Sequence, residues 1–297
     1  MQRISVVVPA FNAAETIVPA LRSVLAQTRP ADEVIVVDDG SQDGTAELVE
    51  RELPGVKVLR QANAGPSAAR NTAAEVAKGD WLAFLDSDDL WLEQKLAAQM
   101  AALGEEPEIG MCSSDWVRSE DKAPPLPPLG GLPRRHITFD DIVRLNRFQT
   151  STVLVRRELW RAVGGFRTAI DGTEDWDFWM RVSRRTDDLH LAWPLVVYRD
   201  EGLSYSKNSR RVYDAMHRML AEMGPPEGPI PEAAYRRLLA WHDVRFAYAF
   251  WRLGRKADLQ AALRHGREAS SRGVMADVAL REFLPYLWRR ARRPFGR

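Results

Sequence analysis

The sequence has little of several features that would narrow its function at once. Cys112 is the single cysteine among 297 residues, so no disulfide can form within the chain, which is typical of a reducing compartment. Lys and Arg number 42 against 41 Asp and Glu, and this balance argues against nucleic acid as a partner. No apolar run reaches the length of about 18 residues that a spanning helix needs, and no signal-like segment opens the chain. These absences predict a cytoplasmic protein.

Two nucleotide-binding signatures are also missing. No G-x-G-x-x-G follows the first predicted strand, and G-x-x-x-x-G-K-[ST] does not occur in the sequence. A dinucleotide-binding domain and a P-loop enzyme are therefore disfavoured.

What the first third does contain is a regular alternation of apolar and amphipathic segments. Because the apolar segments have no polar face, they predict strands of a mostly parallel sheet that is covered by helices. Ligands of such sheets bind at the carboxyl ends of the strands. Strands are expected at 4–9, 33–39, 56–60 and 81–86, and helices at 14–26, 43–52 and 66–78.

The second part of the chain is less regular. A Pro/Gly-rich segment at 119–136 predicts a mobile loop and is a candidate lid. Beyond about 205, the pattern is helical. The other expected elements are strands at 109–117 and 150–157, a helix ended by Gly164 and Gly165, and a helix capped by Thr173. The predicted fold class is therefore α/β with a C-terminal helical appendage.

The sequence "DSDD" crowds carboxylates directly after the strand at 81–86. Mg²⁺ and Mn²⁺ prefer oxygen ligands and are typically held by one or two carboxylates together with substrate phosphates. Asp86 and Asp88, on either side of Ser87, therefore suggest a metal site beside a diphosphate. The alternative is that Asp88 or Asp89 caps a helix that begins at 90 or 91.

Two other segments suit a nucleotide. Asp38 and Asp39 end a strand before Gly40, where a carboxylate can accept hydrogen bonds from a nucleoside. The alternative is a turn with an aspartate that caps the helix near Gly44. Arg70, on the helix at 66–78, is suited to a phosphate, although an ordinary salt bridge explains it nearly as well.

Glu174, Asp175 and Asp177 lie in the first turn of a predicted helix. Negative charge there stabilises the helix, which is the ordinary interpretation. Alternatively, one of these carboxylates is a general base, a role worth roughly 10²–10⁴ in rate. Trp176 and Trp179 suit either the core or stacking on a sugar, and core packing is favoured for at least one.

Six motifs, taken in their order along the chain, resemble those of the family 2 glycosyltransferases over roughly residues 2–205. The resemblance implies a GT-A fold and an inverting transfer of a sugar from a nucleotide diphosphate donor, usually a UDP-sugar, to an acceptor hydroxyl. The motifs that carry it are "VVVPAFN" (6–12), "VVDDGSQDGT" (36–45), "NAGPSAARN" (63–71), "FLDSDD" (84–89), "GGF" (164–166) and "TEDWDFWMR" (173–181).

The resemblance also implies a role for each matching residue. Asp175 would be the catalytic base, and Asp88 would be a ligand of a Mg²⁺ or Mn²⁺ ion. The residues implied to bind the nucleotide-sugar are Pro9, Ala10 and Phe11 at the base, Asp39 and Arg70 beside the nucleotide, and Asp86 and Ser87 near the ribose and diphosphate.

The chain departs from some relatives at two points. It lacks the Q-x-x-R-W motif of processive polysaccharide synthases, so a non-processive hexosyltransferase is expected. Where relatives often place a histidine near the metal, this chain has Asp200 and Glu201, which leaves a third protein ligand open.

Residues 1–205 are predicted to form the glycosyltransferase domain, and 206–297 a helical region with a basic tail. The segment 281–297 has six Arg and one Glu, with aromatic residues between them. This composition suits an anionic membrane surface, where a lipid-linked acceptor would be found, so peripheral contact with the inner face is an expectation; a solvated tail is the alternative. The five histidines, His136, His190, His217, His242 and His265, show no metal-ligand spacing and have no predicted role.

The predicted function is an inverting, metal-dependent glycosyltransferase that acts on a glycan or lipid-linked acceptor in cell-surface polysaccharide synthesis. Two alternatives remain. A nucleotidyltransferase that makes a nucleotide-sugar also uses a parallel sheet and paired aspartates, but "PAFNAAET" does not supply its Gly-rich loop. A non-catalytic nucleotide-sugar binding protein is the other alternative.

Overall fold

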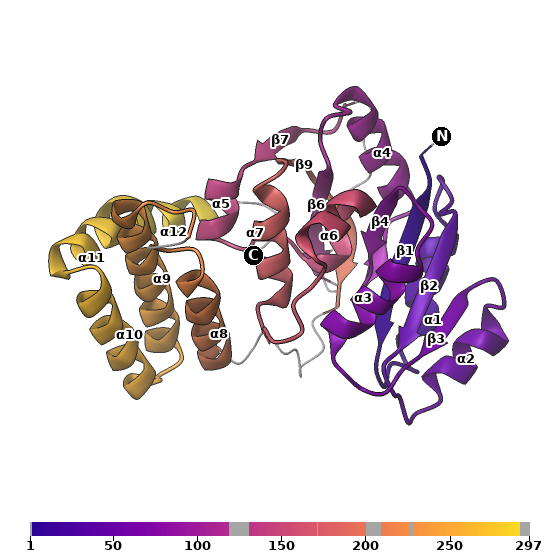
Figure 1. Cartoon of the computed structure of the whole chain (residues 1–297), viewed down its shortest axis with the longest axis horizontal. Helices are drawn as coiled ribbons and strands as arrows, with labels where there is room; N and C mark the ends of the chain where they lie inside the picture. Colours follow the sequence, from indigo (N-terminus) through magenta and orange to yellow (C-terminus); the bar gives the residue numbers. More distant parts are fainter. Residues whose placement is uncertain (1, 119–130, 171, 200–208, 226–227, 292–297) are drawn as a thin grey trace. The chain divides into compact units, whose positions relative to one another are not determined.

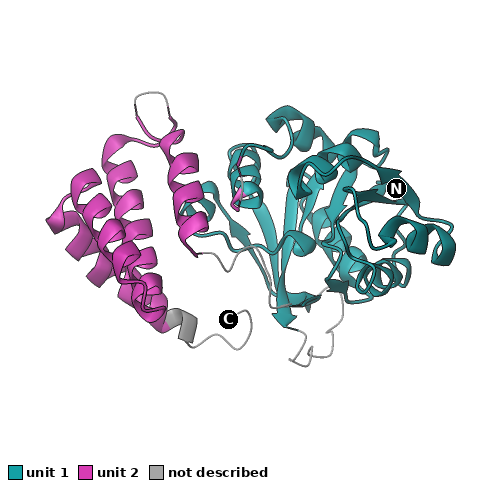
Figure 2. Cartoon of the chain, turned by 90° about the horizontal axis from the view of Figure 1, so that it is seen from below, with its two compact units in different colours: residues 1–169, 174–201, 296 teal, residues 170–173, 202–295, 297 magenta. Residues whose placement is uncertain are grey.

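A computed structural model of the chain describes residues 2–118, 131–170, 172–199, 209–225 and 228–291. The chain divides into two compact units (Figure 2). One comprises residues 1–169 and 174–201, and the other comprises 170–173 and 202–295.

The first unit is built on a nine-stranded sheet whose main order is β3-β2-β1-β4-β8-β6-β9-β5 (Figure 1). Its N-terminal half is parallel, because β1 pairs in parallel with both β2 and β4, and β2 with β3. These strands are fully or largely buried, apart from β3, which confirms the parallel sheet expected from their apolar sequences. Their bounds are β1 Ile4–Ala10, β2 Glu33–Asp38, β3 Lys57–Arg60 and β4 Trp81–Phe84.

The other half of the sheet is mixed. β8 runs antiparallel to both β4 and β6, whereas β9 runs parallel to β6 and antiparallel to β5 and β7. The bounds of these strands are β5 Leu90–Trp91, β6 Met111–Arg118, β7 Arg134–Ile137, β8 Leu154–Arg156 and β9 Asp188–Tyr198.

Helices connect the strands, and those of the N-terminal half follow them as predicted. α3 begins with Pro66 after Gly65, whose φ of 87° suits glycine. The helices of this unit are α1 Ile17–Leu25, α2 Thr45–Glu52, α3 Pro66–Val76, α4 Lys95–Glu105, α5 Phe139–Arg144, α6 Arg157–Val163 and α7 Glu174–Ser183. α6 ends at Gly164, in the left-handed conformation, as expected.

Four local predictions differ from the structure. The strand expected at 150–157 is shorter, because Thr150–Thr152 form a 3-10 turn and β8 covers only Leu154–Arg156. No helix begins at 90 or 91: these residues form β5 against β9, and α4 begins only at Lys95. Thr173 does not cap α7 through its side chain, because its buried hydroxyl has no hydrogen-bond partner among the described residues. The predicted loop at 119–136 is interrupted at 134, where β7 begins to pair with β9, and 119–130 lie outside the described residues.

The second unit is helical, as expected for the C-terminal region. Trp241 of α9 packs with Met275, Val278 and Phe283 in its core. Its helices are α8 Ser209–Ala221, α9 Glu232–Arg252, α10 Lys256–Ala269, α11 Arg272–Val278, the π-helical turn η4 Ala279–Phe283, and α12 Leu284–Ala291. Within the described ranges, no helix has both the length and the apolar character to cross a membrane.

Candidate active site

The predicted site segments meet at one edge of the sheet. In parallel strands the carboxyl ends lie together, and β1, β2 and β4 are neighbours (Figure 1). Ala10 pairs with Asp38, and the backbone N–H of Asp39 donates to the carbonyl of Ala10 at 2.8 Å. The segments that follow these strands, including Phe11, Asp39 and Asp86, therefore start from the same edge.

Arg70 is the centre of the charged part of this edge. Its Nη2 donates to Oδ1 of Asp86 at 2.7 Å, and its side chain is only 7% exposed. Nε and Nη1 of Arg70 are buried without a hydrogen-bond partner in the described part of the chain. Burial disfavours the charged guanidinium, but Asp86, Glu174 and Asp175 together raise the pKa of Arg70 above its ordinary value. Arg70 thus lies within electrostatic reach of the "DSDD" and "TEDWD" motifs at once.

The "GGF" motif packs against Arg70 through the ring of Phe166. The guanidinium carbon of Arg70 lies 5.4 Å from the centre of the Phe166 ring. Asn71, the residue after Arg70, holds Phe166 by two hydrogen bonds: its Nδ2 donates to the Phe166 carbonyl at 2.7 Å, and the Phe166 N–H donates to its Oδ1 at 2.8 Å. At Gly165 a Cβ atom would lie 2.6 Å from Oδ1 of Asn71, so a larger residue there would disturb the two hydrogen bonds between Asn71 and Phe166.

Asp175 is half-buried at the start of α7. Its Oδ2 accepts from Nδ2 of Asn146 at 2.9 Å, and its Oδ1 accepts from the N–H of Trp176 at 2.6 Å. Loss of solvation and the neighbouring charge of Glu174 raise the pKa of Asp175 to about 6, against the lowering effect of these hydrogen bonds and of Arg70. A carboxylate with this pKa is suited to general-base catalysis near neutral pH.

The neighbours of Asp175 on α7 have structural roles. Asp177 is fully buried and accepts from Nη2 of Arg181 at 2.6 Å, one helical turn away. Trp176 and Trp179 are 3% and 0% exposed, so both belong to the core and neither is available to stack on a sugar. The expectation of core packing for at least one tryptophan is confirmed.

The crowded aspartates after β4 point to different partners. Asp86 pairs with Arg70, as described above. Asp89 is 1% exposed and accepts from Oγ of Ser151 at 2.6 Å and from the N–H of Arg199 at 3.1 Å. Burial, followed by the charges of Asp86 and Asp88, raises the pKa of Asp89 well above its ordinary value. Asp89 therefore anchors the end of β9, while Asp88 stays half-buried beside Ser87.

The residues at this edge fit a divalent cation that is bound together with a phosphate. Carboxylates are numerous here: Asp86, Glu174 and Asp175 act on Arg70, and Asp88 lies with Asp86 close enough to Asp89 to raise its pKa. Their oxygens do not form a three-ligand cluster: within the described ranges, such a cluster occurs only in the C-terminal unit. Mg²⁺ commonly keeps one or two carboxylates and completes its shell with water and phosphate oxygens, and Asp88 suits such a site. Asp200 and Glu201 lie outside the described residues.

Asp39, a predicted nucleotide-binding residue, is bonded within the chain. Its Oδ1 accepts from Nε2 of Gln61 at 2.7 Å and from the N–H of Ala64 at 2.9 Å, and its Oδ2 accepts from the N–H of Gly65 at 2.8 Å. With 3% of its surface exposed, Asp39 holds the loop that leads into α3 and Arg70. The sequence alone did not indicate Gln61 as a partner.

The remaining predicted nucleotide-binding residues lie at the end of β1. Pro9 and Ala10 are buried within the strand, whereas Phe11 is 52% exposed directly after it. The start of α2 is held by Asp43, which accepts from the N–H of Thr45 at 3.1 Å and from that of Ala14 at 2.9 Å. Capping at this helix therefore does not depend on Asp39.

Comparisons with known proteins find relatives among glycosyltransferases. Over 160 residues the chain is 34% identical to the putative teichuronic acid biosynthesis glycosyltransferase TuaG of Bacillus subtilis, covering 52% of this chain and 62% of that protein. Over 102 residues it is 40% identical to an Escherichia coli enzyme, the UDP-Glc:alpha-D-GlcNAc-diphosphoundecaprenol beta-1,3-glucosyltransferase WfgD, covering 34% of this chain and 40% of that one. The chain thus spans less than two thirds of these relatives.

The fold also matches a solved structure. The structure of Staphylococcus aureus TarS residues 1–349 in complex with UDP-GlcNAc matches with a TM-score of 0.69 and 21% identity, over 97% of this chain and 87% of that one. The family model "Glycosyl transferase family 2" matches residues 5–159, a range that begins within β1 and includes β2 to β4 and the "DSDD" motif. The resemblance found in the sequence is confirmed, and the chain belongs to glycosyl transferase family 2.

Proposed function

We propose that this protein is an inverting, metal-dependent glycosyltransferase that moves a sugar from a UDP-sugar to a hydroxyl of a glycan or lipid-linked acceptor in cell-surface polysaccharide synthesis. The observation that carries the proposal is the meeting of Arg70 with Asp86 on one side and Glu174 and Asp175 on the other. The positively charged Arg70, carboxylate oxygens that can bind a metal, and a base with a raised pKa therefore lie at the same edge of the sheet.

The donor would lie over the carboxyl ends of β1, β2 and β4. Phe11, the exposed residue after β1, would contact the nucleobase beside Pro9 and Ala10, while Asp39 would act near the nucleoside and through the loop that it holds. Asp86 and Ser87 would lie beside the ribose and diphosphate. Asp88 would hold Mg²⁺ or Mn²⁺, which supplies positive charge to the departing diphosphate when bound. Arg70 adds a fixed positive charge in a poorly solvated place, where it is most effective.

Asp175 would remove the proton from the acceptor hydroxyl. The hydroxyl then attacks the anomeric carbon from the face opposite to the diphosphate, so that the configuration inverts. The hydrogen bond from Asn146 holds the carboxylate in one orientation, and its pKa of about 6 leaves it largely ionised at neutral pH.

The relatives support the choice of donor and acceptor class. WfgD, by its name, transfers glucose from UDP-glucose to a diphosphoundecaprenol-linked sugar, and TuaG is assigned to teichuronic acid synthesis. By analogy, we assign a single, non-processive transfer to residues 1–205 of this chain.

A donor screen tests the proposal. The full chain is incubated with a panel of UDP-sugars, with Mn²⁺, with Mg²⁺ or with a chelator, and released UDP is measured. We expect UDP release from at least one donor, dependent on a divalent cation and increased by acceptor. Release of pyrophosphate from a nucleoside triphosphate and a sugar phosphate would instead support the nucleotidyltransferase alternative. Binding of UDP-sugars without any turnover would support the non-catalytic alternative.

The basic C-terminal segment would bring the enzyme to an anionic membrane. Leu280, Leu284 and Trp288 are 66%, 52% and 58% exposed and follow one another at helical spacing of four. Arg281 beside them is 81% exposed at its side chain, and the segment continues with further arginines; 292–297 lie outside the described residues. An exposed apolar stripe next to basic residues suits the headgroup region of anionic lipids.

Vesicle flotation tests this membrane contact. We expect the chain to float with vesicles that contain anionic lipid, and the double variant Leu284→Gln, Trp288→Ala to lose most of this binding. Trp251→Ala is the matched control, because Trp251 is an equally exposed tryptophan (65%) on another helix. If the unmodified chain did not float, or if it floated no better than the double variant and Trp251→Ala, the result would argue for a solvated tail.

A further inference from the structure

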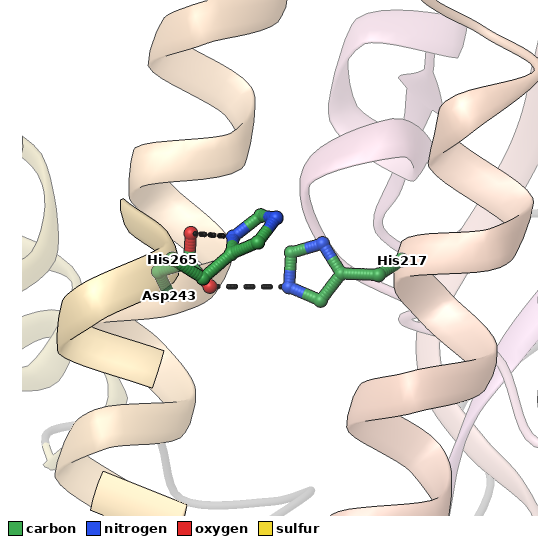
Figure 3. Close-up of side chains that lie close together, drawn as sticks. All are labelled: His217, Asp243 and His265. Carbon is green, nitrogen blue, oxygen red and sulfur yellow. Dashed lines mark hydrogen bonds and ion pairs between the residues drawn. The ribbon is translucent and has the colours of Figure 1, made fainter. Parts of the chain in front are cut away.

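The C-terminal unit contains a cluster of two histidines and an aspartate that has no part in the proposed reaction. His217 comes from α8, Asp243 from α9 and His265 from α10, and Figure 3 shows both rings turned toward the carboxylate. Nε2 of His217 lies 3.1 Å from Oδ1 of Asp243, and Nδ1 of His265 lies 2.9 Å from Oδ2. All three potential ligand atoms lie within 4.8 Å of one another.

The surroundings keep Asp243 ionised and in place. Its side chain is fully buried, and its Oδ1 also accepts from the hydroxyl of Tyr213 at 2.8 Å. Burial alone would raise the pKa of Asp243, but the hydrogen bonds from His217 and His265 hold it below its ordinary value. The carboxylate is therefore an anion at neutral pH, with two imidazoles in direct contact.

Access and packing are also suited to a small ligand. The side chains of His217 and His265 are 16% and 43% exposed, so the cluster can be reached from the side of His265. The two rings lie edge to face with their centres 4.2 Å apart. Gly266, next to His265, lets α10 approach closely, because a Cβ there would lie 3.0 Å from Cβ of Asp243 and 2.5 Å from Sδ of Met275.

We propose that His217, Asp243 and His265 bind a divalent transition metal of the zinc type. Two imidazole nitrogens and one carboxylate oxygen are a common protein donor set for zinc, with a fourth position left for water. Donor atoms at about 2.0–2.1 Å from a tetrahedral zinc ion lie about 3.3 Å apart. The ring nitrogens lie 3.1 and 2.9 Å from different oxygens of Asp243, and the donor atoms all lie within 4.8 Å of one another, so metal binding would draw the two imidazoles closer together around the carboxylate.

The metal would connect three helices. Each coordinating nitrogen would exchange its proton for the metal: a neutral ring would keep its N–H on the other nitrogen, and a protonated ring would release one proton to solvent. No local spacing in the sequence could reveal the site, because its ligands lie 22 and 26 residues apart, each on a different helix. His217 and His265, which had no predicted role, thereby gain a proposed one.

Zinc retention by the full chain tests the proposal. The chain carries Asp88→Asn, so that the proposed nucleotide site does not contribute, and is treated with a chelator, loaded with Zn²⁺, freed of excess metal and analysed for bound zinc. His217→Gln and His265→Gln keep an amide that can donate to Asp243, so they should fold. His136→Gln is the matched control, since His136 belongs to the other unit and bonds to Glu106.

The expected result is about one zinc ion per chain in the parent and in His136→Gln, and none in His217→Gln and His265→Gln. Zn²⁺ should raise the melting temperature only of the two proteins that retain it. Loading with Co²⁺ should give visible absorption bands in those same two proteins. No retention by the parent, which would leave the histidines as simple partners of a buried carboxylate, overturns the proposal. Undiminished retention in both glutamine variants overturns it as well.

Discussion

Replacing Asp175 by Asn is expected to lower kcat by about 10²–10⁴, the usual contribution of a general base. Asn keeps an oxygen that can accept from Asn146 but cannot take up a proton, so folding and donor binding should change little. Steady-state transfer rates with the donor found in the screen, together with the KM for that donor, measure the effect. Transfer at an unchanged rate would remove Asp175 from the mechanism.

The pH profile separates Asp175 from its neighbour Glu174. Because the base must be ionised, kcat should fall about tenfold per pH unit below a pKa of about 6. Glu174→Gln is the matched variant: it removes a negative charge that raises the pKa of Asp175, so activity should persist while the acidic limb moves to lower pH. If the limb stayed in place in Glu174→Gln, another group would be titrating.

Replacing Asp88 by Asn is expected to lower kcat/KM by about 10²–10³, which corresponds to the few kcal/mol that a metal or oxyanion contact supplies. The physical reason is that the amide is a poor ligand for a hard cation, so the charge on the departing diphosphate is no longer neutralised. Titration of Mn²⁺ against activity, and against UDP binding, measures the loss. We expect the activation by Mn²⁺ to require much higher concentrations or to disappear.

Asp89→Asn is the matched control for this experiment. Asp89 has a raised pKa and is buried against Ser151 and the backbone of Arg199, and Asn resembles a protonated aspartate in size. The variant should keep its dependence on Mn²⁺. An equal loss in both variants would mean that the region collapses rather than that Asp88 binds the metal.

Local pattern was sufficient for the parallel half of the sheet and for the placement of its motifs. Strands with apolar residues on both faces must be buried, and parallel strands put their carboxyl ends together, so Asp39 and Asp86 could be assigned to one edge. The local sequence pattern did not predict the structure after β4, where a helix beginning at 90 or 91 was one of the alternatives. The two residues of β5 become a strand because β9, more than 100 residues later in the chain, offers a partner.

Partners distant in sequence account for the rest of the candidate site. Asn146 bonds to Asp175 across 29 residues, and Asn71 holds Phe166 across 95 residues. Asn146 and Gln61, the partner of Asp39, belong to none of the quoted motifs. Asn71 ends the "NAGPSAARN" motif, but nothing in that motif indicates its bond to Phe166.

By itself, the sequence determined the family, the alternation of strands and helices, and the residue types that can bind a nucleotide and a metal, because these follow from hydrophobic period and from short motifs. Only the tertiary structure decided which carboxylate faces Arg70, which one is buried as an anchor, and that His217, Asp243 and His265 converge. The physical reason is that hydrogen bonds and charge interactions act over a few ångströms in space, and packing brings together residues that no local spacing connects.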